Sequence, residues 1–276
     1  MGGDMATLAT LAGILLACGL VAGVLAGLLG VGGGIIMVPI LYFVFGALDS
    51  VDPSVRMHMA VGTSLAAMVP TSIRSAMAHH RKGSVDMALF RRWLPGLLAG
   101  VLAGVVFAAW ADGPALMGVF AVFAMAVALH MLFGRPEWRL AETLPGVGTQ
   151  RCMAIAISGV SVMMGIGGGT FTVPTLTLFG YPIHRAVGTA AAVGVLIAIP
   201  GAVGFILGGL GAAGRPPGSL GYASLVGAAV LIPATVVAAP WGADLAHRLH
   251  PLWLRRAFAL FLGATGLRMA FSLIGG

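Results

Sequence analysis

Apolar stretches about 20 residues long recur along nearly the whole of this sequence, and about 20 residues of helix span the hydrocarbon core of a bilayer. Only 8% of the 276 residues are charged and 59% are hydrophobic, whereas about 25% of the residues in soluble domains are charged. So few charges cannot cover a surface that faces water. We therefore expect an all-α polytopic membrane protein. Short segments of alternating polarity, which would indicate a transmembrane barrel, are absent from the sequence.

The net charge of +7 lies mainly in short loops between apolar segments, where basic residues set membrane orientation. We therefore expect a lipid bilayer and no nucleic acid as a partner. The two cysteines, Cys18 and Cys152, fall within or beside apolar segments. This placement favours neither a disulfide nor a metal site, and the sequence predicts no cofactor.

One glycine-rich motif occurs twice in the sequence. GVGGGIIMVPIL (30–41) and GIGGGTFTVPTL (165–176) share their glycines, a valine, the proline and the final leucine at a constant offset. HMAVGTSLA (58–66) likewise matches HRAVGTAAA (184–192). These matches predict an internal duplication. The domains that we expect are a first repeat (1–133), a linker (134–151) and a second repeat (152–276).

Each repeat is expected to contain a helical hairpin broken at the glycines, followed by three transmembrane helices. The fold would thus have 8–10 membrane segments. The apolar segments of the first repeat lie near 6–29, 35–48, 55–78, 87–110 and 114–133, and those of the second near 152–164, 170–180, 185–208, 220–241 and 252–274.

The second repeat is predicted to be inverted. In each repeat, the hairpin returns the chain to the side it came from, and three helices then cross the membrane. This odd number of crossings puts the start of the second repeat on the opposite side from the start of the first. The loop at 79–92 is strongly basic while its counterpart at 209–219 has only Arg215, and the bias is reversed between 111–114 and 242–256. Because Lys and Arg favour the cytoplasmic side, both termini are expected outside and the linker in the cytoplasm.

Glycine triplets followed by proline form poor helix, so the chain is expected to break there. The helix that follows each break would begin near Ile35 and Thr170 with N–H groups that lack partners, and such ends bind anions. The glycines could instead let helices pack closely. The residues predicted to bind substrate are Gly32, Gly33, Gly34, Ile35, Gly167, Gly168, Gly169, Thr170, Thr63, Ser64, Thr189 and Arg74.

Arg74 and two histidines have two interpretations each. Arg74 lies in an apolar segment, where a charge is usually functional, but it is close enough to the basic loop to extend to the interface. His58 and His184 hold equivalent positions at the start of the third segments. They could gate the pathway or carry protons, or they could cap and anchor a segment end.

GLLGVGGGIIMVPIL (27–41), GIGGGTFTVPTL (165–176) and the paired AVGT segments resemble the sulfite exporter TauE/SafE family, also called toluene sulfonate uptake permeases. The resemblance covers nearly the whole chain. It implies a permease of the bacterial inner membrane for sulfite, sulfonates or related sulfur- or carboxylate-containing anions. Ala190 stands where the first repeat has Ser64, so a mirrored pair of hydroxyls would be incomplete.

The sequence thus predicts a secondary transporter that binds a small anion near the bilayer midplane. An anion channel and a carrier of small carboxylates are the alternatives, and a structural subunit would suit glycines used for packing. Intramembrane proteases need a Ser–His pair or an HExxH motif, and the sequence shows neither. Transport driven by ATP needs a P-loop, which is also absent from the sequence. The chain is therefore not expected to be an enzyme. The coupling ion, H⁺ or Na⁺, and the choice between monomer and homodimer stay open.

Overall fold

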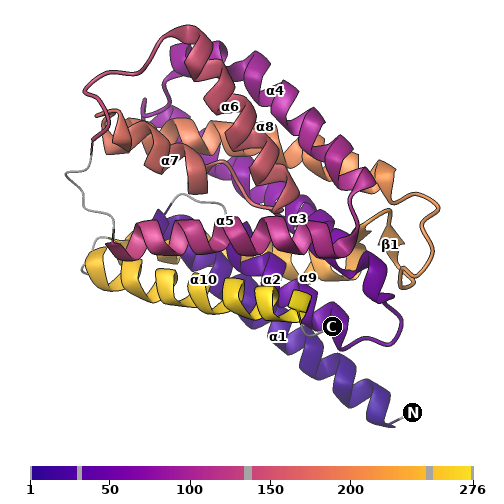
Figure 1. Cartoon of the computed structure of the whole chain (residues 1–276). Coiled ribbons are helices and arrows are strands. Elements are labelled where there is room, and N and C mark those ends of the chain that lie inside the picture. Colours follow the sequence, from indigo (N-terminus) through magenta and orange to yellow (C-terminus); the bar gives the residue numbers. More distant parts are fainter. Residues whose placement is uncertain (1, 30–32, 134–138, 247–250, 275–276) are drawn as a thin grey trace.

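The computed structural model of the chain describes residues 2–29, 33–133, 139–246 and 251–274. Within these ranges the chain forms ten helices (Figure 1). Those of the first half are α1 (Gly2–Leu29), α2 (Gly34–Gly46), α3 (Pro53–Arg81), α4 (Met87–Trp110) and α5 (Gly113–Phe133). Those of the second half are α6 (Val147–Met163), α7 (Gly169–Leu178), α8 (Ile183–Gly208), α9 (Leu225–Ala246) and α10 (Pro251–Ile274).

The all-α fold predicted from composition is confirmed. Within the described residues, α4, α5 and α8 are long and apolar enough to cross a membrane. Two helix starts differ from the expected segments by about five residues. Helix α6 begins at Val147, inside the expected linker. Helix α9 begins at Leu225 rather than near residue 220, because β1 (Ser219–Leu220) and β2 (Ala223–Ser224) first form a small antiparallel hairpin.

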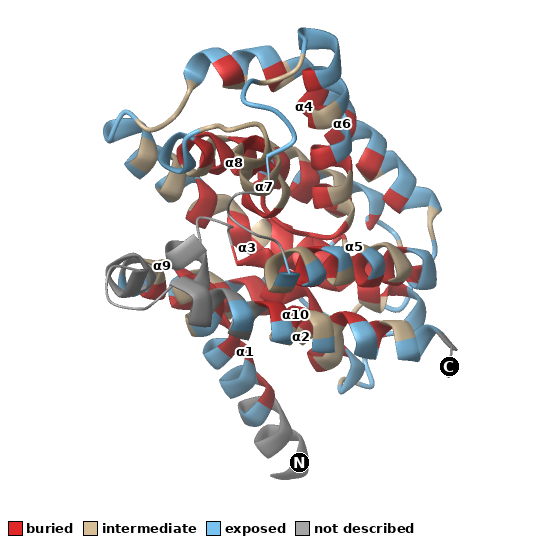
Figure 2. Cartoon of the chain, turned by 60° about the vertical axis from the view of Figure 1, so that its left-hand side comes forward, coloured by how far each residue is buried: buried red, intermediate tan, exposed pale blue. Residues whose placement is uncertain are grey.

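Helices of one half pack mainly on helices of the other. Helix α1 packs on α9 and α6 packs on α4, while α3 lies against α8. Helices α5 and α10 lie side by side (Figure 1). Figure 2 shows the buried residues gathered on α3, α7 and α8 in the middle of the bundle. The two halves therefore share one core.

Glycines line the crossings of α1 with α9 and of α4 with α6. A Cβ atom at Gly23 would lie 2.6 Å from the Thr235 carbonyl oxygen, and one at Gly96 would lie 2.7 Å from the Arg151 carbonyl oxygen. Gly100 and Gly104 follow Gly96 at intervals of four and also approach α6. Small residues at this spacing let membrane helices approach until their backbones touch.

The outer faces of the bundle carry exposed apolar side chains. Examples are Leu102 on α4, Val122 on α5 and Phe271 on α10, which are between 62% and 69% exposed. In a membrane protein these faces contact lipid, so their apolar character costs nothing there. The core is consequently held by close packing and hydrogen bonds rather than by removal of apolar surface from water.

The crossing of α4 with α6 gives a first prediction. Gly96→Ala should lower the melting temperature in detergent by about 5 °C, since overpacking against a backbone oxygen costs about 1–3 kcal/mol. Gly148→Ala in α6 is the control, because no atom lies within 4 Å of a Cβ atom at that position. Equal melting temperatures for the two variants would show that the crossing tolerates a side chain.

Candidate functional site

Both glycine motifs interrupt the helices, as predicted. Helix α2 begins at Gly34, directly after Gly33, whose φ of 70° suits glycine. Helix α6 ends at Met163 and α7 begins at Gly169, with Gly165 at φ 65° between them. Gly32 lies outside the described residues.

The two breaks touch each other in the core. A Cβ atom at Gly34 would lie 2.5 Å from the Gly165 carbonyl oxygen and 2.9 Å from the Ile166 Cα. Ile35 and Ile166 are both buried. Close packing therefore explains Gly34, as the alternative interpretation of the glycines required, and it brings the two breaks to one place.

The start of α7 carries backbone donors without acceptors. Thr172 N donates to Gly168 O at 3.0 Å, as the first regular bond of the helix. No described residue accepts from the N–H groups of Gly167, Gly168, Gly169 or Thr170. All four residues are buried, and a buried donor without an acceptor destabilises a protein by about 1–3 kcal/mol.

The first break is better satisfied. Ile36 N and Met37 N both donate to Gly33 O, at 3.1 and 3.2 Å. Gly34 N and Ile35 N have no acceptor among the described residues. Among the described residues, the break before α7 therefore has the larger number of N–H groups without an acceptor.

Three buried hydroxyls near the second break also lack a partner among the described residues. They belong to Ser161 and Thr172, both 0% exposed, and to Thr170, which is 4% exposed. Thr170 was predicted from the sequence, whereas Ser161 and Thr172 were not. The available signal was that both are hydroxyl residues within four positions of the break, but sequence alone does not tell a free hydroxyl from a bonded one.

Ser64 connects the first half to the second break. Its hydroxyl donates to Gly165 O at 2.7 Å, so this predicted residue does lie at the break. Ala190, which stands at the equivalent position of the second half, has no hydroxyl to offer.

The two AVGT threonines make matching contacts. Thr63 Oγ1 accepts from Ser224 N, and Thr189 Oγ1 accepts from Asp86 N, both at 2.9 Å. The preceding glycines allow the close approach, because a Cβ atom at Gly188 would lie 2.5 Å from the Ser84 carbonyl oxygen. Thr63 thus binds the segment that leads into α9, and Thr189 binds the segment that leads into α4. That either contacts substrate stays a prediction.

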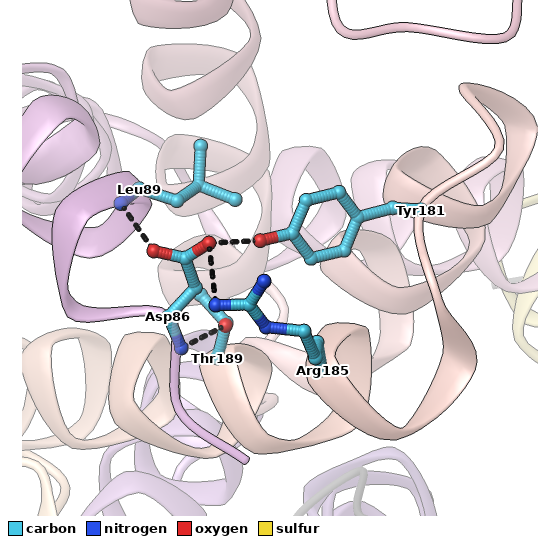
Figure 3. Close-up of polar contacts among 5 residues, drawn as sticks. All are labelled: Asp86, Leu89, Tyr181, Arg185 and Thr189. Carbon is cyan, nitrogen blue, oxygen red and sulfur yellow. Dashed lines mark hydrogen bonds and ion pairs between the residues drawn. The ribbon is translucent and has the colours of Figure 1, made fainter. Parts of the chain in front are cut away.

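Asp86 joins the halves at the contact of Thr189 (Figure 3). Its carboxylate accepts from Leu89 N at 2.9 Å and from the Tyr181 hydroxyl, and it lies 3.3 Å from the guanidinium of Arg185. Burial acts to raise the pKa of the Asp86 carboxyl, but these hydrogen bonds and the Arg185 charge outweigh it and hold the pKa below its usual value. Burial and the carboxylate raise the pKa of Tyr181 to about 12, so the phenol remains a donor.

The remaining predicted side chains lie away from the breaks. Arg74 and His184 are exposed, which agrees with an interfacial arginine and an anchoring histidine. His58 is buried, and its Nε2 donates to the carbonyl oxygens of Ala108 and Ala111 at 3.0 and 3.1 Å. That Arg74 binds substrate, and that His58 and His184 gate the pathway or carry protons, stay predictions. Across the described residues, no three His, Cys, Asp or Glu side chains cluster as metal ligands.

The Asp86 contacts predict a pH-dependent stability. A carboxyl with a lowered pKa stabilises the fold above its unfolded pKa of about 4, and this contribution is lost as the pH falls through the folded pKa. Asp86→Asn should lower the melting temperature by about 5 °C at pH 7. The difference from the wild type should shrink as the pH falls below about 4 and through the lowered pKa of Asp86.

Asp49→Asn, at an exposed position, serves as the control in the same thermal scans. Its difference from the wild type should be small at every pH. A difference for Asp86→Asn that stayed constant with pH would contradict the assignment of the stabilising charge to this carboxylate.

The comparisons with known proteins agree with this architecture. Residues 15–269 match the family described as sulfite exporter TauE/SafE. A probable membrane transporter protein of Haemophilus influenzae is 33% identical over 251 residues, which cover 91% of this chain and 95% of that protein. A probable membrane transporter protein of Methanocaldococcus jannaschii is 25% identical over 266 residues, 93% of this chain and 94% of its own.

YunE of Bacillus subtilis, also named a probable membrane transporter protein, is 26% identical over 219 residues, 71% of this chain and 78% of YunE. No solved structure matches the chain. The family and the names of these relatives support a helical, multi-pass membrane transporter. By the extent of the family match, the chain belongs to the sulfite exporter TauE/SafE family.

Proposed function

We propose that this protein is a secondary transporter of small anions, above all sulfite, sulfonates and related sulfur oxyanions. The proposal rests on the buried N–H groups at the start of α7, for which no described residue is an acceptor, and on the adjacent Thr170 hydroxyl, which has no partner among the described residues either. An anion supplies the acceptors that these donors lack, and the dipole of α7 favours its negative charge. The family description names sulfite export.

The two breaks would bind the anion together from opposite halves. Gly34 and Gly165 are in contact, so donors of both breaks are near one point of the core. Broken helices at matching positions of two repeats are typical of transporter substrate sites near the midplane. Because the described residues of both breaks are buried, the anion would reach them only when the halves move relative to each other.

An inverted arrangement of the two repeats is part of the proposal. It is supported by the exchange of packing partners, in which α1 packs on α9 as α6 packs on α4. Segments expected on one side also contact each other. Asp52 N donates to Gly214 O at 2.9 Å, which joins the two repeats, and Leu140 N donates to Leu178 O at 2.7 Å, which joins the linker to the end of α7.

The charged loops support an orientation in the bacterial inner membrane with both termini in the periplasm. The basic loop at 79–92 and the linker at 134–151 would then be cytoplasmic. Every Asp and Glu lies in a loop or near a segment end, so a buried carboxylate is not available as proton carrier. The coupling ion is therefore left open between H⁺ and Na⁺.

Two alternatives use the same donors. An anion channel would pass current without countertransport, and a carrier of small carboxylates would prefer acetate to sulfite. We favour the transporter because its relatives are named as transporters, and we propose no enzymatic activity.

Thr170→Val tests the proposed site. Valine has nearly the shape of threonine, and removal of an unpartnered hydroxyl should leave the melting temperature unchanged or higher. If the hydroxyl binds the anion, the KM for counterflow of labelled sulfite in proteoliposomes should rise about tenfold, since a hydrogen bond to a charge contributes about 1.5–3 kcal/mol.

Thr177→Val is the matched control in the same helix, because the Thr177 hydroxyl already donates to the carbonyl oxygens of Val173 and Pro174. It should transport sulfite like the wild type. Equal KM values for the two variants would remove Thr170 from the site. Sulfite current without counterflow in the wild type would favour the channel.

The orientation is testable with single cysteines in a cysteine-free background. Ala213 and Leu140 are both exposed in loops. Ala213→Cys should react with a membrane-impermeant maleimide in spheroplasts, whereas Leu140→Cys should react only after permeabilisation. The opposite labelling would reverse the orientation, and labelling of both from outside would contradict the single net crossing of the membrane expected between the two positions.

A further inference from the structure

Helix α8 contains one buried glycine that packing does not explain. A Cβ atom at Gly188 would lie 2.5 Å from the Ser84 carbonyl oxygen, and one at Gly201 would lie 2.6 Å from a Val162 methyl group. At Gly194 the nearest atoms would be Gly168 N at 3.6 Å and Ser72 Cβ at 3.9 Å, both ordinary van der Waals distances. An alanine would therefore fit at Gly194.

Glycine inside a helix destabilises it by about 1 kcal/mol relative to alanine. Gly188 and Gly201 offset this loss by letting neighbouring chains approach. Gly194 has no such compensation, although it is buried in the middle of α8. Outside the backbone of its own helix, the described atoms within 4 Å of its Cβ atom would be Gly168 N and Ser72 Cβ alone, which is few for a buried position, since core side chains contact many atoms. The structure thus leaves room for about a methyl group beside Gly194.

The space borders the proposed anion site. Its nearest boundary is the nitrogen of Gly168, one of the N–H groups without an acceptor. Its other boundary is Ser72 of α3, whose hydroxyl donates to Met68 O at 2.7 Å. A Cβ atom at Gly168 would in turn lie 2.9 Å from Gly194 N, so the break and α8 are in direct backbone contact here.

We infer that Gly194 determines the size of the anionic group that this transporter accepts, by leaving room beside the Gly168 N–H for an oxygen of a sulfite or sulfonate group. The inference rests on the proposed function and adds a residue outside both glycine motifs to it. A methyl group at position 194 would occupy the space that the oxygen needs. A sulfur oxyanion with three oxygens should be affected more than chloride, which has one small centre.

The test compares Gly194→Ala with Gly208→Ala. Gly208 ends the same helix, and no atom lies within 4 Å of a Cβ atom there. Gly194→Ala should keep or raise the melting temperature, raise the KM for sulfite counterflow about tenfold, and abolish the thermal shift that sulfite gives the wild type. Its chloride flux should change less than its sulfite flux. Gly208→Ala should behave like the wild type in every assay.

Two results would overturn the inference while leaving the proposed function intact. One is an unchanged KM for sulfite in Gly194→Ala, in a wild type that transports sulfite and loses affinity on Thr170→Val. The other is a melting temperature well below that of Gly208→Ala, which would mean that the space beside Gly194 is already filled. A wild type without counterflow or thermal shift for any of the anions would overturn the proposed function, and the inference with it.

Discussion

The structure depends on how the backbone is satisfied where the helices break inside an apolar core. Each break exposes N–H and C=O groups in surroundings that offer no water. At the first break, Gly33 O accepts two of these N–H groups, and at the second, Gly165 O accepts from Ser64. Among the described residues, the N–H groups that begin α7 remain without an acceptor, together with those of Gly34 and Ile35. The proposed anion site follows from this remainder, because a bound anion is the missing acceptor.

The contacts around the breaks also connect the two halves. Thr63 and Thr189 hold opposite loops by the same kind of hydrogen bond, but only the contact at Thr189 adds charged groups, through Asp86 and Arg185. Neutral and charged junctions respond differently to pH and salt. We therefore expect the two junctions to respond differently to pH and salt.

Much of the fold was predictable from the sequence, because lipid restricts spanning segments to helices and glycine triplets interrupt them. The breaks at Gly33 and Gly165 occur where the repeated motif predicted them. The start of α9 was missed because the residues before Leu225 form a β-hairpin. At that end of the segment, the pairing of two short strands prevents the helix from starting earlier. Hydropathy does not detect this pairing.

The site was predictable only in part. The sequence by itself determined that the protein is a helical membrane protein, that one glycine motif occurs twice and that two helices begin inside the core. These properties follow from apolar length and from the backbone of glycine and proline. Only the tertiary structure decided which hydroxyls are free. Thr63 and Thr189 accept from loop N–H groups, whereas Thr170, Thr172 and Ser161 have no described partner. The hydrogen-bond partners of these hydroxyls come from segments far apart in the chain, so no local sequence pattern predicts which hydroxyl will have a partner.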